Sequence, residues 1–192
     1  MNPDVWLFHL LNDFVGTFPP LDWLTLAIVN DYTVPTAISL VAVWLWFAGE
    51  TEEERTRNRR AVIFIALGIL ISQALIKDLS RFYFRPRPFA TETVKLLFYR
   101  PSVSSFPSIP IAVAFTFAAG AWYANKRIAK LLIGLGVLYA LARVYAGVHY
   151  PSDVIVGAML GAGMVYIVVR LRFVFEPLAD LAIRIARRLA FA

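Results

Sequence analysis

Cysteine is absent from the 192-residue sequence, and histidine occurs only at His9 and His149. The absence of cysteine excludes disulfides and thiolate metal sites, and two histidines are too few for a multi-histidine metal centre. Charge is also scarce, because 17% of the residues are charged while 59% are hydrophobic and the mean hydropathy is +0.66. This composition is too apolar for an ordinary soluble domain and predicts an integral membrane protein.

Apolar stretches along the chain predict an all-α membrane bundle of six helices. A short amphipathic helix at residues 5–15 is too short to span a bilayer, and five longer membrane helices follow it. The expected membrane helices cover residues 21–49, 61–84, 107–123, 128–148 and 151–169. The sequence shows no repeat and no second domain, so residues 1–192 are expected to form one integral membrane domain.

Two segments depart from a plain apolar helix. The polar pair Asn30-Asp31 and Pro35 interrupt the first membrane stretch, where we expect a kink or a break. Residues 176–192 combine apolar residues with three arginines. This second pattern is typical of an amphipathic helix that lies on the membrane surface.

Twelve of the 19 basic residues fall in three segments, which are residues 50–60, 126–130 and 170–188. Because cytoplasmic loops of membrane proteins are enriched in Lys and Arg, we expect these segments on the cytoplasmic side of a bacterial-type membrane. The other seven basic residues surround the motifs described below, which predicts a site on the outer face. The net charge of +6 therefore indicates basic loops and an anion site, with no nucleic-acid partner.

The segment 85–89 reads Arg-Pro-Arg-Pro-Phe and follows the end of a predicted membrane helix. Guanidinium groups present a fixed fork of donors to phosphate oxygens and stay charged, so Arg85 and Arg87 are candidate phosphate ligands. The prolines favour an extended backbone in which alternate residues point different ways, so we expect only one of the two to reach the site. The alternative is a basic belt that extends to the lipid headgroups.

A second cluster contains Arg143, His149 and Asp153, separated by five and three residues. We expect Asp153 to fix the tautomer of His149 by accepting from one ring nitrogen, which leaves the other nitrogen free to attack phosphorus. Arg143 would neutralise the phosphoryl oxygens. A buried His–Asp pair that only ties two helices together is the alternative. Charged groups at membrane depth are costly, however, and they usually mark functional sites.

Ser108 is expected to cap the helix that runs to Tyr123, and Pro110 fits the first turn of such a helix. Free N–H groups and the positive dipole end at a helix N-terminus suit a bound anion. Ser108 is therefore a further candidate for phosphate binding. Ordinary helix capping is the simpler alternative, and both roles are compatible.

These motifs together resemble the three-part signature of the type 2 phosphatidic acid phosphatase (PAP2) superfamily. The wording of segments 83–89, 105–108 and 147–153 is most similar to its undecaprenyl-pyrophosphate phosphatase branch, the bacitracin-resistance type. The resemblance covers nearly the whole chain. It implies a six-helix membrane core and hydrolysis through a phosphohistidine, without a metal or other cofactor.

The resemblance also implies a role for particular residues. His149 would be the nucleophile and Asp153 its orienting partner. Arg87, Arg143 and the region of Ser108 would hold the phosphate.

The sequence departs from the family pattern in the first and third motifs. The family has a lysine seven positions before the motif arginine, and Ser80 stands there instead. Lys77 and Arg81 lie nearby and are further candidates for phosphate binding. In the third motif, Ala142 replaces the serine that precedes Arg143.

The largest departure is Pro110, which stands where the second motif of the family has a histidine. That histidine is the family's general acid, and proline can neither donate nor accept its proton. We therefore expect impaired activity, retained for diphosphates whose leaving group is already a stable phosphate anion.

The sequence predicts a lipid pyrophosphate phosphatase that hydrolyses undecaprenyl pyrophosphate to undecaprenyl phosphate on the outer membrane face. Its expected partner is a membrane lipid that carries the phosphate. Two alternatives remain open. One is a non-catalytic protein of the same fold that binds or transports lipid phosphates, and the other is a phosphatase of glycerolipid phosphates.

Overall fold

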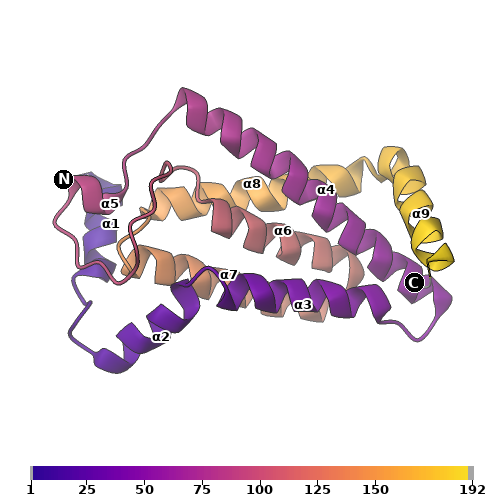
Figure 1. Ribbon diagram of the computed structural model, residues 1–192, viewed down its shortest axis with the longest axis horizontal. Coiled ribbons are helices and arrows are strands. Elements are labelled where there is room, and N and C mark those ends of the chain that lie inside the picture. The colour runs from indigo at the N-terminus through magenta and orange to yellow at the C-terminus, as the bar shows by residue number, and fades with distance from the viewer. Residues whose placement is uncertain (1, 190–192) are drawn as a thin grey trace.

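The computed structural model describes residues 2–189, and this part of the chain is helical without any strand (Figure 1). The predicted all-α membrane fold is confirmed. Residues 190–192 of the predicted tail lie outside the described residues. The helices are α1 (Pro3–Asn12), α2 (Pro19–Val29), α3 (Thr33–Phe47), α4 (Glu52–Phe82), α5 (Pro88–Thr91), α6 (Ile109–Ala124), α7 (Lys126–Tyr145), α8 (Pro151–Arg170) and α9 (Arg172–Arg188).

Three of these helices, α4, α7 and α8, are long and apolar enough to cross a membrane. Helices α2 and α3 together form a fourth candidate span, which is bent by 51° at the break between them. Asn30 explains the break, because its side-chain oxygen accepts from the backbone N–H groups of Tyr32 and Thr33 at 2.9 and 2.7 Å. These hydrogen bonds stabilise the start of α3 after the bend. The break that the polar pair Asn30-Asp31 predicted is therefore present.

Helix α6 has 16 residues, fewer than α4, α7 and α8, and packs against all three in the bundle (Figure 1). Gly161 of α8 lies against the backbone carbonyl of Ala112, and Gly157 lies against that of Ser108. A side chain at either glycine would collide with the α6 backbone. The small residues thus allow α6 and α8 to approach closely, as in other membrane bundles, and they bring the two helix N-termini together.

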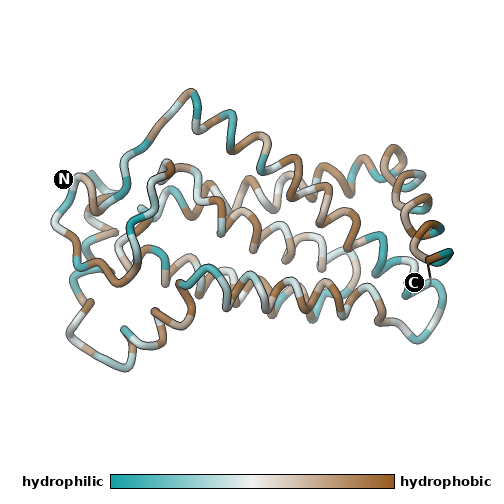
Figure 2. Tube along the Cα trace, in the orientation of Figure 1, coloured by the Kyte–Doolittle hydropathy of each residue, from teal (hydrophilic) through white to brown (hydrophobic). Residues whose placement is uncertain are grey.

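The two ends of the bundle differ. The α3–α4 loop, the α6–α7 loop and α9 lie at one end, whereas α1, α5 and the α7–α8 loop lie at the other (Figure 1). Brown residues predominate along the helices, and teal residues occur at both ends (Figure 2). The three basic segments identified in the sequence all fall at the α9 end.

Helix α9 begins four residues earlier than the predicted tail and packs against the first turns of α4. Arg60 of α4 donates to both carboxylate oxygens of Asp180 at 2.9 and 3.0 Å. Helix α4 also begins earlier than predicted, because Thr51 caps it by accepting from the Glu54 N–H at 3.2 Å. Charged residues that looked like a loop in the sequence therefore form the first turns of a long helix.

Candidate active site

A cavity of about 250 Å³ opens at the end of the bundle that is opposite α9. It lies between the start of α6, the end of α7 and the loops on either side of α5. Its lining residues are Asp31, Arg87, Tyr99, Pro101, Val103, Ser104, Ile109, Pro110, Arg143 and His149. The fold therefore brings the arginine motif, the altered second motif and the histidine motif to one place.

His149 is almost completely buried in the loop that joins α7 to α8. Its Nδ1 lies 2.9 Å from the backbone oxygen of Ser105. A carbonyl oxygen can only accept, so Nδ1 carries the proton and Nε2 presents a lone pair. Nε2 lies 3.3 Å from Nη1 of Arg87, which also lines the cavity. His149 is thus held with Nδ1 protonated and with Nε2 as the nitrogen that can act as a nucleophile.

Burial lowers the pKa of His149 to about 4. The imidazole is consequently neutral at neutral pH and its Nε2 lone pair is available for attack.

The sequence led us to expect a direct hydrogen bond between Asp153 and His149, and the structure shows a longer contact between them. Asp153 Oδ2 lies 3.8 Å from His149 Nδ1, too far for a hydrogen bond. Ser105 connects the two residues instead, because its hydroxyl donates to Asp153 Oδ2 at 2.5 Å while its carbonyl accepts from the histidine. Asp153 also accepts from the Tyr150 N–H at 2.8 Å and thereby caps α8. The carboxylate therefore orients His149 through Ser105.

Arg87 and Arg143 supply the positive charge of the cavity. Arg87 is anchored by the backbone oxygens of Val103 and Val148, each 2.9 Å from a guanidinium nitrogen. Burial, together with the positive charge of Arg143, lowers the pKa of Arg87 to about 10, so it remains a cation at neutral pH. Two buried guanidinium groups of like charge at one cavity suit an anion such as phosphate.

Arg143 is placed at the cavity by the last turns of α7. Its Nη2 donates to Asp31 at 2.9 Å and to the hydroxyl of Tyr139 at 2.6 Å. Its Nε is buried and has no hydrogen-bond partner in the described part of the chain. A buried donor of this kind is costly unless a ligand satisfies it, which supports an anion in the cavity.

Arg85 was a candidate phosphate ligand, and it is not among the residues that line the cavity. Its guanidinium donates to Asp153 Oδ1 at 2.7 Å and to Asp4 of α1 at 2.6 Å. Asp4 also accepts from the backbone N–H and the hydroxyl of Ser152. Arg85 therefore stabilises the Asp153 carboxylate and connects α1 to the site through Asp4. Only Arg87 of the two motif arginines lines the cavity, as the proline-rich backbone predicted.

Lys77 and Arg81 were also expected near the phosphate, and the structure places both outside the cavity lining. They are exposed on the last turns of α4, where Arg81 pairs with Asp78 at 3.1 Å. This end of α4 diverges from the other helices (Figure 1). The family lysine position, Ser80, donates instead to the Phe106 carbonyl at 3.4 Å.

Ser108 precedes α6 as predicted, but its hydroxyl does not cap the helix. The hydroxyl oxygen is buried and has no partner among residues 2–189. The Ser108 backbone N–H donates to the carbonyl of Asp153 at 3.0 Å. The next residues, Ile109 and Pro110, line the cavity. The position of the missing histidine therefore faces the same space as His149.

The other histidine is not a substitute for the missing one. His9 of α1 lies 3.2 Å from Asp13 and 3.8 Å from Glu92, and it is not among the residues that line the cavity. Ser105 is one of the site residues that the sequence reasoning missed, together with Asp31 and Tyr99. The position of Ser105 next to the Phe-Pro-Ser motif was the available signal, but its contacts depend on the tertiary structure.

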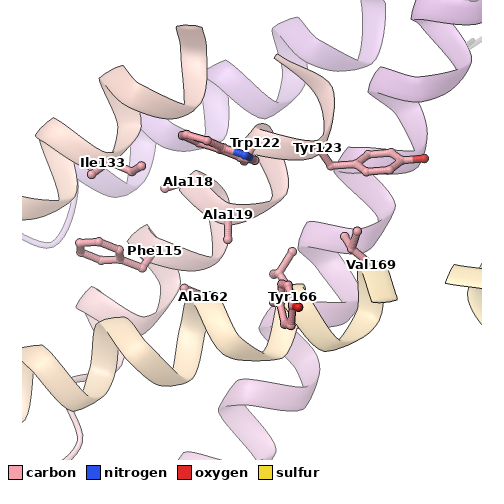
Figure 3. A pocket seen from close by; sticks show the side chains of 10 residues that line it. Phe115, Ala118, Ala119, Trp122, Tyr123, Ile133, Ala162, Tyr166 and Val169 are labelled. Carbon is pink, nitrogen blue, oxygen red and sulfur yellow. The ribbon is translucent and has the colours of Figure 1, made fainter. Parts of the chain in front are cut away.

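A larger hollow of about 540 Å³ lies between α6, α7 and α8 (Figure 3). Its lining consists of aromatic, aliphatic and alanine side chains, including Phe115, Trp122 and Tyr166. No lining residue carries a charge. The smaller cavity, which contains Arg87, Arg143 and His149, is therefore the candidate site for an anion.

Comparison with known proteins agrees with this geometry. Residues 61–176 match the model of the PAP2 superfamily. Undecaprenyl-diphosphatase BcrC of Bacillus subtilis is 27% identical over 165 residues, which cover 86% of this chain and 82% of the relative. The putative undecaprenyl-diphosphatase YbjG of Escherichia coli is 32% identical over 162 residues, covering 83% of this chain and 78% of the relative.

Solved structures show the same arrangement of helices. Aquifex aeolicus LpxE superposes with a TM-score of 0.66 at 28% identity, over 86% of this chain and 94% of LpxE. The transmembrane PAP2 type phosphatidylglycerolphosphate phosphatase of Bacillus subtilis gives a TM-score of 0.64 over 90% of this chain and 87% of its own. At 19% identity it shows the fold alone. From its matched family model, its motifs and its fold, this chain belongs to the PAP2 superfamily.

Proposed function

We propose that this protein is an integral membrane phosphatase of lipid diphosphates, which transfers the terminal phosphoryl group to His149 and then to water. The observation that carries the proposal is the hydrogen bond between His149 Nδ1 and the Ser105 carbonyl. It leaves the Nε2 lone pair beside Arg87 at a cavity that also contains Arg143. The names of the two undecaprenyl-diphosphatase relatives support a polyprenyl diphosphate as substrate, converted to the monophosphate.

The first step forms a bond between His149 Nε2 and the terminal phosphorus. The bond from that phosphorus to the bridging oxygen breaks, and its electron pair leaves with the lipid monophosphate. Arg87 and Arg143 stabilise the charge on the phosphoryl oxygens. The Ser108 hydroxyl, which is buried without a partner among residues 2–189, is a further candidate donor beside the lining residues Ile109 and Pro110. In the second step water displaces the histidine and releases inorganic phosphate. The mechanism invokes no metal or cofactor.

Pro110 determines which substrates this chain can use. Expulsion of an alkoxide from a phosphate monoester requires a proton donor, and loss of a general acid typically costs about 10²–10⁴-fold in rate. A lipid diphosphate expels a phosphate anion, which is stable without that proton. Selective cleavage of diphosphates is therefore expected.

Phosphate release from undecaprenyl diphosphate and from phosphatidic acid, measured with the purified protein in detergent, tests this function. The diphosphate should be cleaved at least about 10²-fold faster, because only the monoester depends on the missing acid. Equal rates would contradict the proposed selectivity. Binding of the diphosphate without any phosphate release would favour a lipid-phosphate binding protein.

The site is proposed to face the outer side of the membrane, because the three basic segments lie at the opposite end of the bundle. The absence of cysteine allows a direct test with single cysteines. A membrane-impermeant maleimide should label Ser102→Cys, near the cavity, in intact cells that lack an outer membrane barrier. Glu53→Cys, at the α9 end, should react only after permeabilisation. The reverse pattern would contradict the orientation.

A further inference from the structure

The second half of the reaction needs a base for the attacking water, and Pro110 cannot provide it. Among the described residues that line the cavity, Asp31 is the only carboxylate. The remaining polar groups there are poorly suited to the task. Arg87 and Arg143 are cations, and Ser104 uses its hydroxyl to donate to the Phe106 carbonyl at 3.0 Å.

Asp31 reaches the cavity because of the break between α2 and α3. Its Oδ1 accepts from Arg143 Nη2 at 2.9 Å, and its Oδ2 accepts from the Tyr99 hydroxyl at 2.7 Å. Both oxygens of the Asp31 side chain therefore accept hydrogen bonds from neighbouring donors. The side chain is 44% exposed, so water can reach it.

We propose that Asp31 is the general base that activates water in the hydrolysis of the phosphohistidine. This inference rests on the proposed function. Arg143 moves from Asp31 to the phosphoryl oxygens when substrate binds, which frees lone pairs on Oδ1. The water oxygen then bonds to phosphorus as the P–Nε2 bond breaks and the electron pair returns to His149. Asp31 takes the water proton and later releases it to solvent.

Tyr99 is the other titratable group in this cluster, and it fits the role less well. Its hydrogen bond to Asp31 raises the pKa of the Tyr99 phenol, so the phenol holds its proton at neutral pH and cannot accept one from water. The hydrogen bond from the Tyr99 hydroxyl instead orients the Asp31 carboxylate.

Rapid-quench kinetics of Asp31→Asn with a terminally radiolabelled polyprenyl diphosphate test the inference, because the two chemical steps are seen separately. The variant should release a burst of lipid monophosphate stoichiometric with enzyme, and labelled phosphohistidine should accumulate. Steady-state phosphate release should fall by about 10²–10⁴-fold, the usual effect of a lost general base. The burst itself reports a folded and competent site.

Three further variants sharpen this test. Asp13→Asn changes an exposed aspartate at the same end of the bundle, and it should behave like the unsubstituted chain. Asp31→Glu keeps a carboxylate and should recover part of the lost turnover. Adding Pro110→His to Asp31→Asn should also restore turnover, because an imidazole then faces the cavity and can accept the proton.

The inference is overturned if Asp31→Asn leaves steady-state turnover unchanged. It is also overturned if the variant loses the burst and accumulates no phosphohistidine, because Asp31 would then serve only to hold Arg143. Failure of the proposed function gives a different result, since the unsubstituted chain would release no phosphate and carry no label at His149.

Discussion

Pro110→His is expected to raise the turnover of lipid phosphate monoesters by about 10²–10⁴-fold, which is the usual contribution of a general acid. Position 110 lies in the first turn of α6 and lines the cavity with His149. A histidine there can donate to the alkoxide that leaves from a monoester. The gain on diphosphates should be much smaller, because their leaving group needs no proton. Initial rates on phosphatidic acid and undecaprenyl diphosphate measure both effects.

Pro110→Ala is the matched control, because it removes the proline ring without adding a proton donor. The alanine variant should keep the substrate selectivity of the unsubstituted chain. If alanine and histidine raised monoester turnover equally, the relevant change would be the shape of the cavity. A histidine variant with no gain on monoesters would contradict the assignment of this position to acid catalysis.

His149→Gln is expected to lower phosphate release by about 10⁴-fold or more, as removal of a catalytic nucleophile does in other enzymes. Glutamine keeps a polar side chain of similar size, although its amide nitrogen takes the place of Nε2 and not of the Nδ1 that bonds the Ser105 carbonyl. It has no ring nitrogen, so it cannot carry the phosphoryl group. Phosphate release from the lipid diphosphate over long incubations measures the loss.

Two controls separate this chemical loss from a structural one. Thermal unfolding of His149→Gln in detergent should show a folded protein that is less stable by about 1–3 kcal/mol, the cost of leaving the Ser105 carbonyl without its partner. Binding of the lipid diphosphate should also persist, since Arg87 and Arg143 are unchanged. If His149→Gln kept about a tenth of the rate of phosphate release, His149 could not be the nucleophile.

Much of the site was predictable because local sequence determines it. Proline on both sides of Arg87 directs one arginine into the cavity, and the end of α7 carries Arg143 next to the loop of His149. The apolar stretches predicted α6, α7 and α8 within a few residues at each end, whereas α4 begins nine residues earlier than predicted. Asn30 marked the break between α2 and α3, since its side chain satisfies the first N–H groups of the new helix.

The remaining features depend on contacts between distant segments, which no local pattern reveals. Arg85 looked like a phosphate ligand until α1 placed Asp4 against its guanidinium. Ser105 lies 44 residues from His149 in the sequence and yet holds its ring. Asp31 appeared only as a helix interruption, and the bend at that position brings it to Arg143. Each residue gained its role from a partner that tertiary packing supplied.

The central claim is the covalent intermediate at His149, and direct trapping of that intermediate tests it. The protein would be mixed with a polyprenyl diphosphate labelled at the terminal phosphorus and quenched in alkali, where phosphohistidine survives. We predict alkali-stable, acid-labile label on the peptide that contains His149, and none in His149→Gln. Release of phosphate at an undiminished rate with no label on that peptide would contradict the account.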